Sequence, residues 1–411
     1  MNKPAPKLRP VNYTADTHRG QPVWVLEDPL QLSDKTLILP PLLAQASTHL
    51  DGWHTLAEVQ ANLAAQVGVT VPLEVLEELV QSLDALFLFD NERFAAQMGE
   101  VRRAWRAQPA RPPQLAGRNY PAEPEALAEF LDGYGASYPK GDDASWHGRA
   151  IISPHIDYQR GGAVYAQVWH QAEKAVQAAD LILIFATDHR GGLGSLTLSS
   201  LPYATPYGVL PTDEKLVATL VNNLGEEVAF GLELNHRTEH SVELAAVWLH
   251  HALRGQTPPA VVPLLIGSFH HFVAQNGHPT QDEEMMDFIA TLVEATRGQR
   301  VLCVASVDLA HVGPAFDDEF VMDEARRAAL VAADASLMEA VLAGDEERFY
   351  REIAAVEDAN KVCGFSPLYL MLRYLNGRGE GAISGRQIAY QHCPADELDQ
   401  SLVSICGLLL D

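Results

Sequence analysis

The stretch Leu181–Gly192, with the sequence LILIFATDHRGG, sets the fold class expected for this chain of 411 residues. Its first five residues are all large and apolar, which predicts a strand buried on both faces of a sheet. Runs of the same kind occur at 150–153, 261–266 and 301–306, and segments with helical spacing lie at 162–178, 283–297 and 323–343. Buried strands that alternate with helices predict an α/β fold with a mixed sheet flanked by helices, closed by a terminal pair of strands at 386–391 and 402–409.

Three of the predicted strands lead directly to a histidine. These histidines are His155, His189 and, in an Asp-x-x-His spacing that begins at Asp308, His311. A single histidine at such a place most often packs or caps a helix. Ligands of open α/β sheets, however, collect beyond the carboxyl ends of the strands, and an imidazole that binds a divalent metal needs an acceptor for its second nitrogen. Three equivalent strand ends with nearby aspartates therefore favour a functional site.

Two further segments carry reactive side chains at predicted helix starts. Cys363 lies at a loop-to-helix junction, where a helix N-terminus favours the thiolate as a nucleophile or metal ligand, although a lone cysteine is more often a small buried apolar group. His240 precedes a helix for which Thr238 or Ser241 is the expected N-cap. The remaining cysteines are expected to pack in or beside strands: Cys303, Cys393 and Cys406.

The N-terminal part of the chain predicts a separate unit. Two short strands, three helices and a closing strand at 86–89 suggest a winged-helix-like α+β domain over residues 1–98. A stretch rich in Arg, Ala and Pro at 99–114 is expected to be a helical tail and linker. The α/β domain then occupies residues 115–411.

The composition excludes several classes of partner. The chain has 54 Asp and Glu against 29 Lys and Arg, a formal charge of −25, which argues against nucleic acid or an anionic membrane. It has neither a run of about 18 apolar residues nor an apolar signal segment near its start. Four scattered cysteines without a CxxC pair do not form a disulfide framework. We expect a cytoplasmic protein.

The motifs occur in the order of a known family. They are Pro154-His155, Thr187-Asp188-His189, Glu239-His240-Ser241-Val242-Glu243, the segment 306–313 (SVDLAHVG) and Cys363-Gly364. In this order the chain resembles the Memo family, called AmmeMemoRadiSam system protein B in prokaryotes, over about residues 115–411. The resemblance implies a core similar to the class III extradiol dioxygenases of the LigB type. Residues 1–98 resemble, more weakly, the PqqD-type winged-helix modules that bind leader peptides.

The resemblance also implies a metal site made of two histidines and a cysteine, which by motif are His155, His189 and Cys363. The metal would be iron or copper. The same resemblance places Asp308, His311 and His240 in the pocket. We expect Asp308 and His311 to orient ligands or carry protons and His240 to bind substrate or solvent.

One departure from the family pattern and one difference from the two-His-one-carboxylate sites of dioxygenases bear on the chemistry. Arg190 follows His189, where the family often has an aromatic residue or a second histidine, which bears on the charge of the pocket. A thiolate in place of a carboxylate ligand is softer and more easily oxidised, which bears on dioxygenase chemistry.

The sequence supports three functions. The first is a metal-dependent redox protein or oxidoreductase that acts on an unknown small molecule or peptide and has radical-SAM and other proteins of the AmmeMemoRadiSam system as partners. The second is a non-catalytic adaptor that binds a ligand or peptide in a dioxygenase-like pocket. The third is a metal-free thiol enzyme in which His155 or His311 is the base for Cys363. Metal content and turnover with oxygen separate the three.

Overall fold

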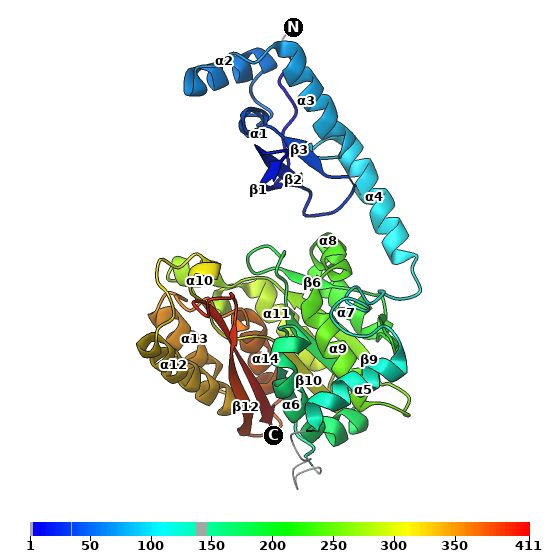
Figure 1. Ribbon diagram of the computed structural model, residues 1–411. Helices are drawn as coiled ribbons and strands as arrows, with labels where there is room; N and C mark the ends of the chain where they lie inside the picture. Colours follow the sequence, from blue (N-terminus) through cyan, green and yellow to red (C-terminus); the bar gives the residue numbers. More distant parts are fainter. Residues whose placement is uncertain (1–2, 34, 137–145) are drawn as a thin grey trace. The chain divides into compact units, whose positions relative to one another are not determined.

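The computed structural model describes residues 3–33, 35–136 and 146–411 and divides the chain into two compact units, Met1–Gln108 and Pro109–Asp411 (Figure 1). Residues 1, 2 and 34 of the predicted N-terminal domain lie outside the described residues. Among the residues that are described, no helix is long and apolar enough to cross a membrane.

The N-terminal unit consists of a small antiparallel sheet and four helices. The sheet has the order β1-β2-β3. Its elements are β1 (Asn12–His18), β2 (Gln21–Glu27), β3 (Leu37–Leu39), α1 (Pro41–Ser47), α2 (Leu56–Val67), α3 (Leu73–Ala85) and α4 (Glu92–Arg106). Helix α2 begins with a capping box in which the Thr55 hydroxyl accepts from the Glu58 amide and the Glu58 carboxylate accepts from the Thr55 amide. Helix α4 continues through residue 106.

The predicted closing strand at 86–89 is wrong. After α3 the chain makes a turn in which Phe87 has a left-handed φ of 61°, and the only β contact of this segment is a single bridge between Phe89 and Leu8. Leu86, Leu88 and Phe89 are buried in the core of the unit. The apolar run is therefore explained by the packing of a buried turn. A run of so few apolar residues occurs in buried turns as well as in strands.

The larger unit contains the predicted mixed sheet, and the α/β fold class is confirmed. Its eight strands have the order β11-β13-β4-β10-β5-β9-β6, with β12 paired to β13. Four central strands are parallel: β4 (Ala150–Ser153), β10 (Val301–Ser306), β5 (Leu181–Thr187) and β9 (Ala260–Ile266). The antiparallel strands are β6 (Leu196–Leu198), β11 (His311–Val312), β12 (Gly385–Pro394) and β13 (Leu402–Leu410), of which the last two are the predicted terminal pair.

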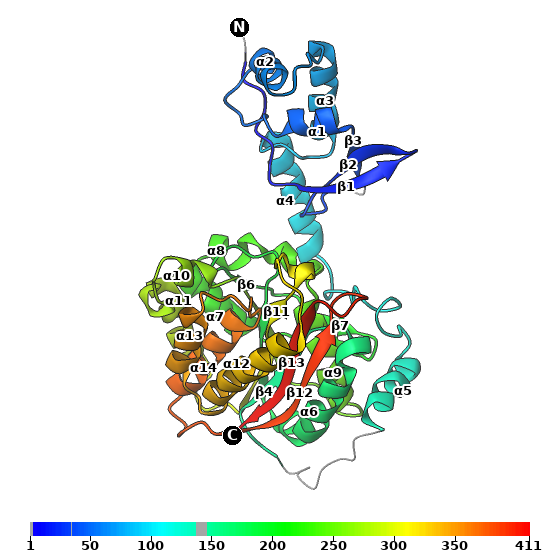
Figure 2. The ribbon, with the colours of Figure 1, turned by 60° about the vertical axis from the view of Figure 1, so that its left-hand side comes forward.

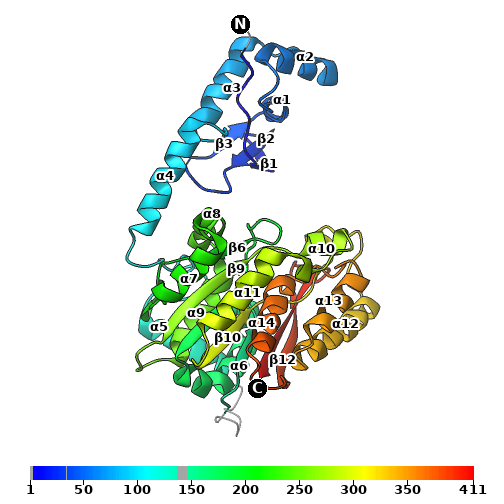
Figure 3. The same ribbon diagram turned by 180° about the vertical axis from the view of Figure 1, so that it is seen from behind.

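Helices cover both faces of the sheet (Figures 2 and 3). Side chains of β5 alternate between two hydrophobic clusters, with Leu183 and Phe185 in one and Ile182 and Ile184 in the other. The first cluster includes α7 (Glu214–Leu224), α11 (Glu283–Ala295), α12 (Glu324–Leu342), α13 (Glu346–Ala355) and α14 (Phe365–Gly377). The second includes α5 (Pro124–Gly135), α6 (Tyr158–Ala178) and α9 (His240–Ala252). Shorter elements are β7 (Tyr203–Thr205), β8 (Gly208–Leu210), α8 (Glu226–Gly231) and α10 (His270–Ala274).

The strand register brings three loops to one level. Ser306 at the end of β10 pairs with Ser153 on β4 and with Ala186 on β5. Parallel strands that end in register deliver the residues that follow them to the same edge of the sheet. The segments that begin at residues 154, 187 and 307 therefore emerge side by side.

Candidate metal centre

The structure brings together the three side chains expected to bind metal. One ligating atom each of His155, His189 and Cys363 lies within 4.8 Å of the other two. His155 follows β4, His189 follows β5, and Cys363 precedes α14. The Cys363 Sγ is 3.2 Å from the His155 Nε2. Residues separated by as many as 208 positions thus form one cluster.

Gly364 allows Cys363 to reach this cluster. A Cβ at position 364 would lie 2.8 Å from the backbone oxygen of Asp308 and 2.8 Å from the Cβ of Val307. The Gly364 amide donates to that Asp308 oxygen at 3.0 Å, and the Cys363 amide donates to Leu309. The loop before α14 is therefore packed directly on the loop after β10, which a larger residue would push away.

His155 is held in one orientation by backbone groups. Its Nδ1 donates to the Ser306 carbonyl at 2.9 Å, so the Nε2 of the neutral ring carries no proton and faces Cys363. The Asp308 carboxylate accepts from the His155 amide at 2.9 Å and from the Ile156 amide at 3.3 Å. Asp308 therefore fixes the backbone of the loop that carries His155.

Glu239 orients His189. Its carboxylate accepts from the His189 Nδ1 at 3.0 Å and from the His189 amide at 3.1 Å, which leaves the Nε2 of His189 toward Cys363. Glu239 is also the N-cap of α9 and accepts from the amides of His240 and Ser241. The expectation that Thr238 or Ser241 caps this helix is therefore wrong. The Ser241 hydroxyl instead donates to the Thr187 carbonyl at the end of β5.

The charges of the cluster favour a thiolate beside imidazolium rings in the metal-free protein. Burial raises the pKa of Cys363, but the charge of His155 and hydrogen bonds from His155 and His189 outweigh it and hold the pKa well below the usual value. Burial lowers the pKa of His155, yet the charges of Cys363 and Asp308 raise it to about 9. The pKa of His189 is raised to about 10, against burial, by hydrogen bonds to Cys363 and Glu239.

His240 and His311 do not belong to the cluster of His155, His189 and Cys363 but line the cavity beside it. The His240 ring stacks on His189 with centroids 4.8 Å apart, and its Nδ1 is 3.1 Å from Glu239. The His311 Nδ1 faces the Leu309 carbonyl at 3.2 Å, and its ring packs against Phe316. Among the described residues, two groups are close enough to share an ion. The first is the cluster of His155, His189 and Cys363, and the second consists of His189, Glu239 and His240. Asp308 and His311 belong to neither group.

Two cavities open at the cluster. The larger, about 600 Å³, is lined by His155, His240, Asp308 and His311 together with further polar residues, such as Asp157 and Arg160, and apolar residues. The smaller, about 360 Å³, is lined by Cys363, Asp188 and Asp358 among others. His189 lines both cavities. The cluster can thus be approached from two sides.

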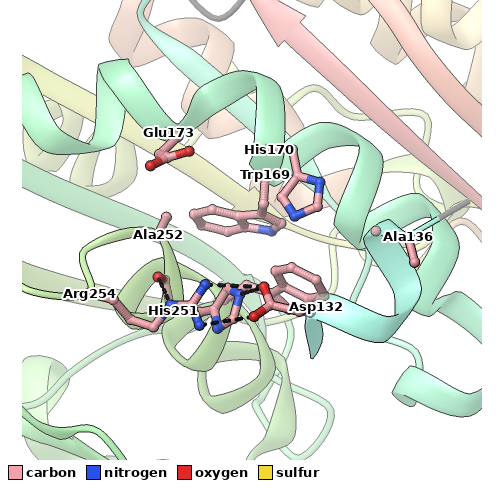
Figure 4. Close-up of a pocket in the computed structure, with 10 residues that line it drawn as sticks. Asp132, Ala136, Trp169, His170, Glu173, His251, Ala252 and Arg254 are labelled. Carbon is pink, nitrogen blue, oxygen red and sulfur yellow. Dashed lines mark hydrogen bonds and ion pairs between the residues drawn. The ribbon is translucent and has the colours of Figure 1, made fainter. Parts of the chain in front are cut away.

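A separate cavity of about 420 Å³ lies between α5, α6 and the end of α9. Figure 4 shows Asp132 in this cavity beside Arg254 and His251. The Asp132 carboxylate accepts from both Arg254 Nη atoms and from the His251 Nε2, each at 3.1 Å. His251 is therefore part of the hydrogen-bonded group around the ion pair of Asp132 and Arg254 and does not belong to the candidate metal ligands.

Sequence reasoning missed a buried ion pair that supports the start of α9. Glu243 forms an ion pair with Arg111, and both side chains are almost completely buried. The same carboxylate accepts from the Tyr120 hydroxyl at 2.5 Å and from the Leu115 amide at 2.7 Å. The residues that lead into the α/β unit are thereby tied to the helix turn that follows Glu239 and His240.

The other three cysteines have the surroundings expected of packing residues. Cys303, Cys393 and Cys406 are buried, and burial raises the pKa of each thiol, that of Cys393 to about 12. They are poor nucleophiles and poor metal ligands in this state.

Comparison with known proteins gives the family. The family described as "Memo-like protein" matches residues 111–408, which is most of the chain. The chain belongs to this family. Its matched region starts at Arg111, the buried partner of Glu243, and includes the cluster of His155, His189 and Cys363.

Relatives of the Memo-like chain occur in bacteria and archaea. A MEMO1 family protein of Aquifex aeolicus is 23% identical over 388 residues, 94% of this chain and 95% of that protein. One of Thermus thermophilus is 29% identical over 299 residues, 71% of this chain and 82% of its own length. One of Archaeoglobus fulgidus is 27% identical over 277 residues, 66% of this chain and 89% of its own length. The alignment with the Aquifex protein extends into the N-terminal unit.

Proposed function

We propose that this Memo-like protein binds iron or copper through His155, His189 and Cys363 and acts as a non-haem redox protein or oxidoreductase. The observation that carries the proposal is the convergence of these three donor atoms within 4.8 Å. Its substrate is a small molecule or peptide that enters the 600 Å³ cavity beside the cluster.

The donor set fits such a metal. Bonds of about 2.0–2.3 Å from imidazole nitrogen and thiolate sulfur place two donors up to about 4.5 Å apart, so a slight movement of these side chains suffices to share one ion. A soft thiolate with two imidazoles suits copper and iron better than magnesium or calcium. The hydrogen bonds of both Nδ1 atoms fix the rings so that each Nε2 is the donor.

The roles of the neighbouring residues follow from their contacts. A bound iron or copper ion would supply one-electron redox chemistry and Lewis acidity. His240 and His311 each have Nδ1 directed at a protein oxygen, which leaves each Nε2 for a molecule in the larger cavity. His240 would bind substrate or solvent there, and His311 would carry a proton. Asp308 positions the His155 loop through its two backbone hydrogen bonds.

The proposal also covers the domain organisation, the cellular location and the partner proteins. Residues 1–98 would be a winged-helix-like module, 99–114 a linker whose last part is held to the larger domain by the buried pair of Arg111 and Glu243, and 115–411 the dioxygenase-like domain of a cytoplasmic protein. The partners would be radical-SAM and other proteins of the AmmeMemoRadiSam system.

Replacement of the thiol tests the metal site. Cys363→Ser should preserve the fold and lower the metal-to-protein ratio at least about tenfold, because a hydroxyl rarely deprotonates at neutral pH. Cys303→Ser is the control, since its buried hydroxyl should lower stability by about 1–3 kcal/mol and leave metal content unchanged. Elemental analysis and thermal melting of both variants decide between the two roles. Equal metal content in Cys363→Ser and the parent would remove the cysteine from the site.

A metal-free thiol enzyme is the second candidate, because the Cys363 Sγ and His155 Nε2 are 3.2 Å apart. A protein purified without metal whose Cys363 is alkylated rapidly by iodoacetamide, and slowly after His155→Ala, would favour this function. If metal is present, oxygen consumption with a reductant and candidate substrates separates the oxidoreductase from a binding adaptor.

A further inference from the structure

A groove of about 310 Å³ lies between α12, α13 and the loop that leads to Cys363. Its volume is at the lower end for small-molecule sites. Six apolar side chains supply most of its lining: Ala333, Leu337, Ile353, Ala355, Val356 and Val362. The proposed redox function does not use this groove.

One polar atom in the groove wall lacks a partner. Arg348 donates to Oε1 of Glu352 at 2.7 Å, whereas Oε2 of Glu352 is buried and has no hydrogen-bond partner among the described residues. A buried carboxylate oxygen is unfavourable without a donor. Because the terminal torsion of glutamate is soft, a small rotation would turn this oxygen toward a donor bound in the groove.

The charges around the groove favour a cationic donor. Glu352 and Asp358 line it, and Glu352 shares Arg348 with Glu339 of α12. Two carboxylates therefore share Arg348, while the cations near Asp358 are His270 and Lys361. A ligand with an anionic head would be repelled, and an ammonium head would pair with the unpartnered oxygen of Glu352.

The loop that forms one wall has an unusual backbone. Glu357, Asp358 and Lys361 all have left-handed φ angles, 52°, 51° and 50°, which residues with a side chain adopt only where surrounding contacts enforce them. This backbone places Asp358 and Val362 in the groove wall, while the carbonyl of Asn360 accepts from the His311 amide at 2.8 Å. The groove is therefore a built feature directly behind the candidate metal centre.

We propose that this groove binds a small primary amine with an apolar body, its ammonium on Glu352 and its apolar part against Leu337 and Ile353. The amine is a ligand of a second site, which shares Asp358 and Val362 as a wall with the smaller cavity at the metal cluster.

Binding of benzylamine to the full-length protein tests the proposal, with benzoate as a probe of similar size and opposite charge. Saturation-transfer NMR and calorimetric titration should show binding of benzylamine and none of benzoate. Ala333→Phe fills the groove and should abolish benzylamine binding. Val331→Phe is the matched control, because it adds the same ring to α12 at a position that is 44% exposed and does not line the groove.

Glu352→Gln tests the head group. Loss of the charge-assisted hydrogen bond should weaken benzylamine binding about tenfold, and thermal melting checks that each variant is folded. Equal binding of benzylamine and benzoate, or unchanged benzylamine binding in Ala333→Phe, would overturn the proposal. Binding that Val331→Phe weakens as much as Ala333→Phe would do the same.

Discussion

Replacement of Glu239 by glutamine should weaken metal binding without removing any ligand atom. Oε1 of Glu239 accepts from Nδ1 of His189 and from the amides of His240 and Ser241, and Oε2 accepts from the His189 amide. Glutamine retains one acceptor oxygen and puts an NH₂ group opposite an N–H donor. Loss of such an acceptor behind a metal-bound histidine lowers metal affinity about 10–100-fold.

The same change also removes a negative N-cap, which lowers the free energy of unfolding by about 1–2 kcal/mol. Metal affinity is measured by competition with a chelator, and stability by urea unfolding of the metal-free protein. The metal affinity of Glu239→Gln should fall by more than its lower free energy of unfolding explains, because the variant no longer holds the His189 ring in its orientation.

Glu243→Gln is the matched control for this prediction. Glu243 lies one turn further along α9, is equally buried, and contacts Arg111 and Tyr120 rather than a candidate ligand. Removing one charge of a buried pair should destabilise the fold by about 3–5 kcal/mol and leave metal affinity nearly unchanged while the protein is folded. If both variants lose metal affinity equally, or if Glu239→Gln loses none, then Glu239 does not orient a metal ligand.

Three further predictions concern other residues. Gly364→Ala should destabilise the larger unit and reduce metal content, because its Cβ would lie 2.8 Å from the backbone of Asp308; melting and elemental analysis would both have to be unchanged to refute this. Thr55→Ala should lower the stability of a 1–108 fragment by about 1 kcal/mol through loss of the α2 cap, and an unchanged urea midpoint would contradict it. Burial lowers the pKa of His236 to about 4, so the stability that it contributes above pH 6.5 should fall by about 3 kcal/mol as the pH drops from 6.5 to 4. A His236→Gln variant should show a smaller pH dependence of unfolding over that interval, and an identical slope would refute the assignment.

Periodicity and strand ends predicted much of the larger unit. The apolar run 181–185 lies within β5, and the terminal strands form the expected pair. His155 and His189 converge because parallel strands in register bring their following loops together, a rule that needs no coordinates. The contact of Cys363 with His155 itself followed only from the family resemblance, since nothing local in the sequence specifies it.

The supporting carboxylates could not be predicted in the same way. Glu239 resembles any acidic residue before a helix, and its contacts with His189 cross 50 positions. The partners of Glu243 lie 123 to 132 positions away, beyond any local pattern. The strand expected at 86–89 failed for the opposite reason, because a short apolar run fits a buried turn as well as a strand.

The order of the strands determines when during synthesis the residues of the candidate metal centre can come together. Strand β4, which carries His155 toward the cluster, is bordered on one side by β10 and on the other by β13, the last strand of the chain. A ribosome that has translated both histidines has yet to make Cys363, and the strand that covers the second edge of β4 follows later still. Chains arrested before about residue 400 would therefore leave the ribosome with the cluster's ligands on an uncovered strand edge. Metal loading of the proposed site would then follow synthesis of β13.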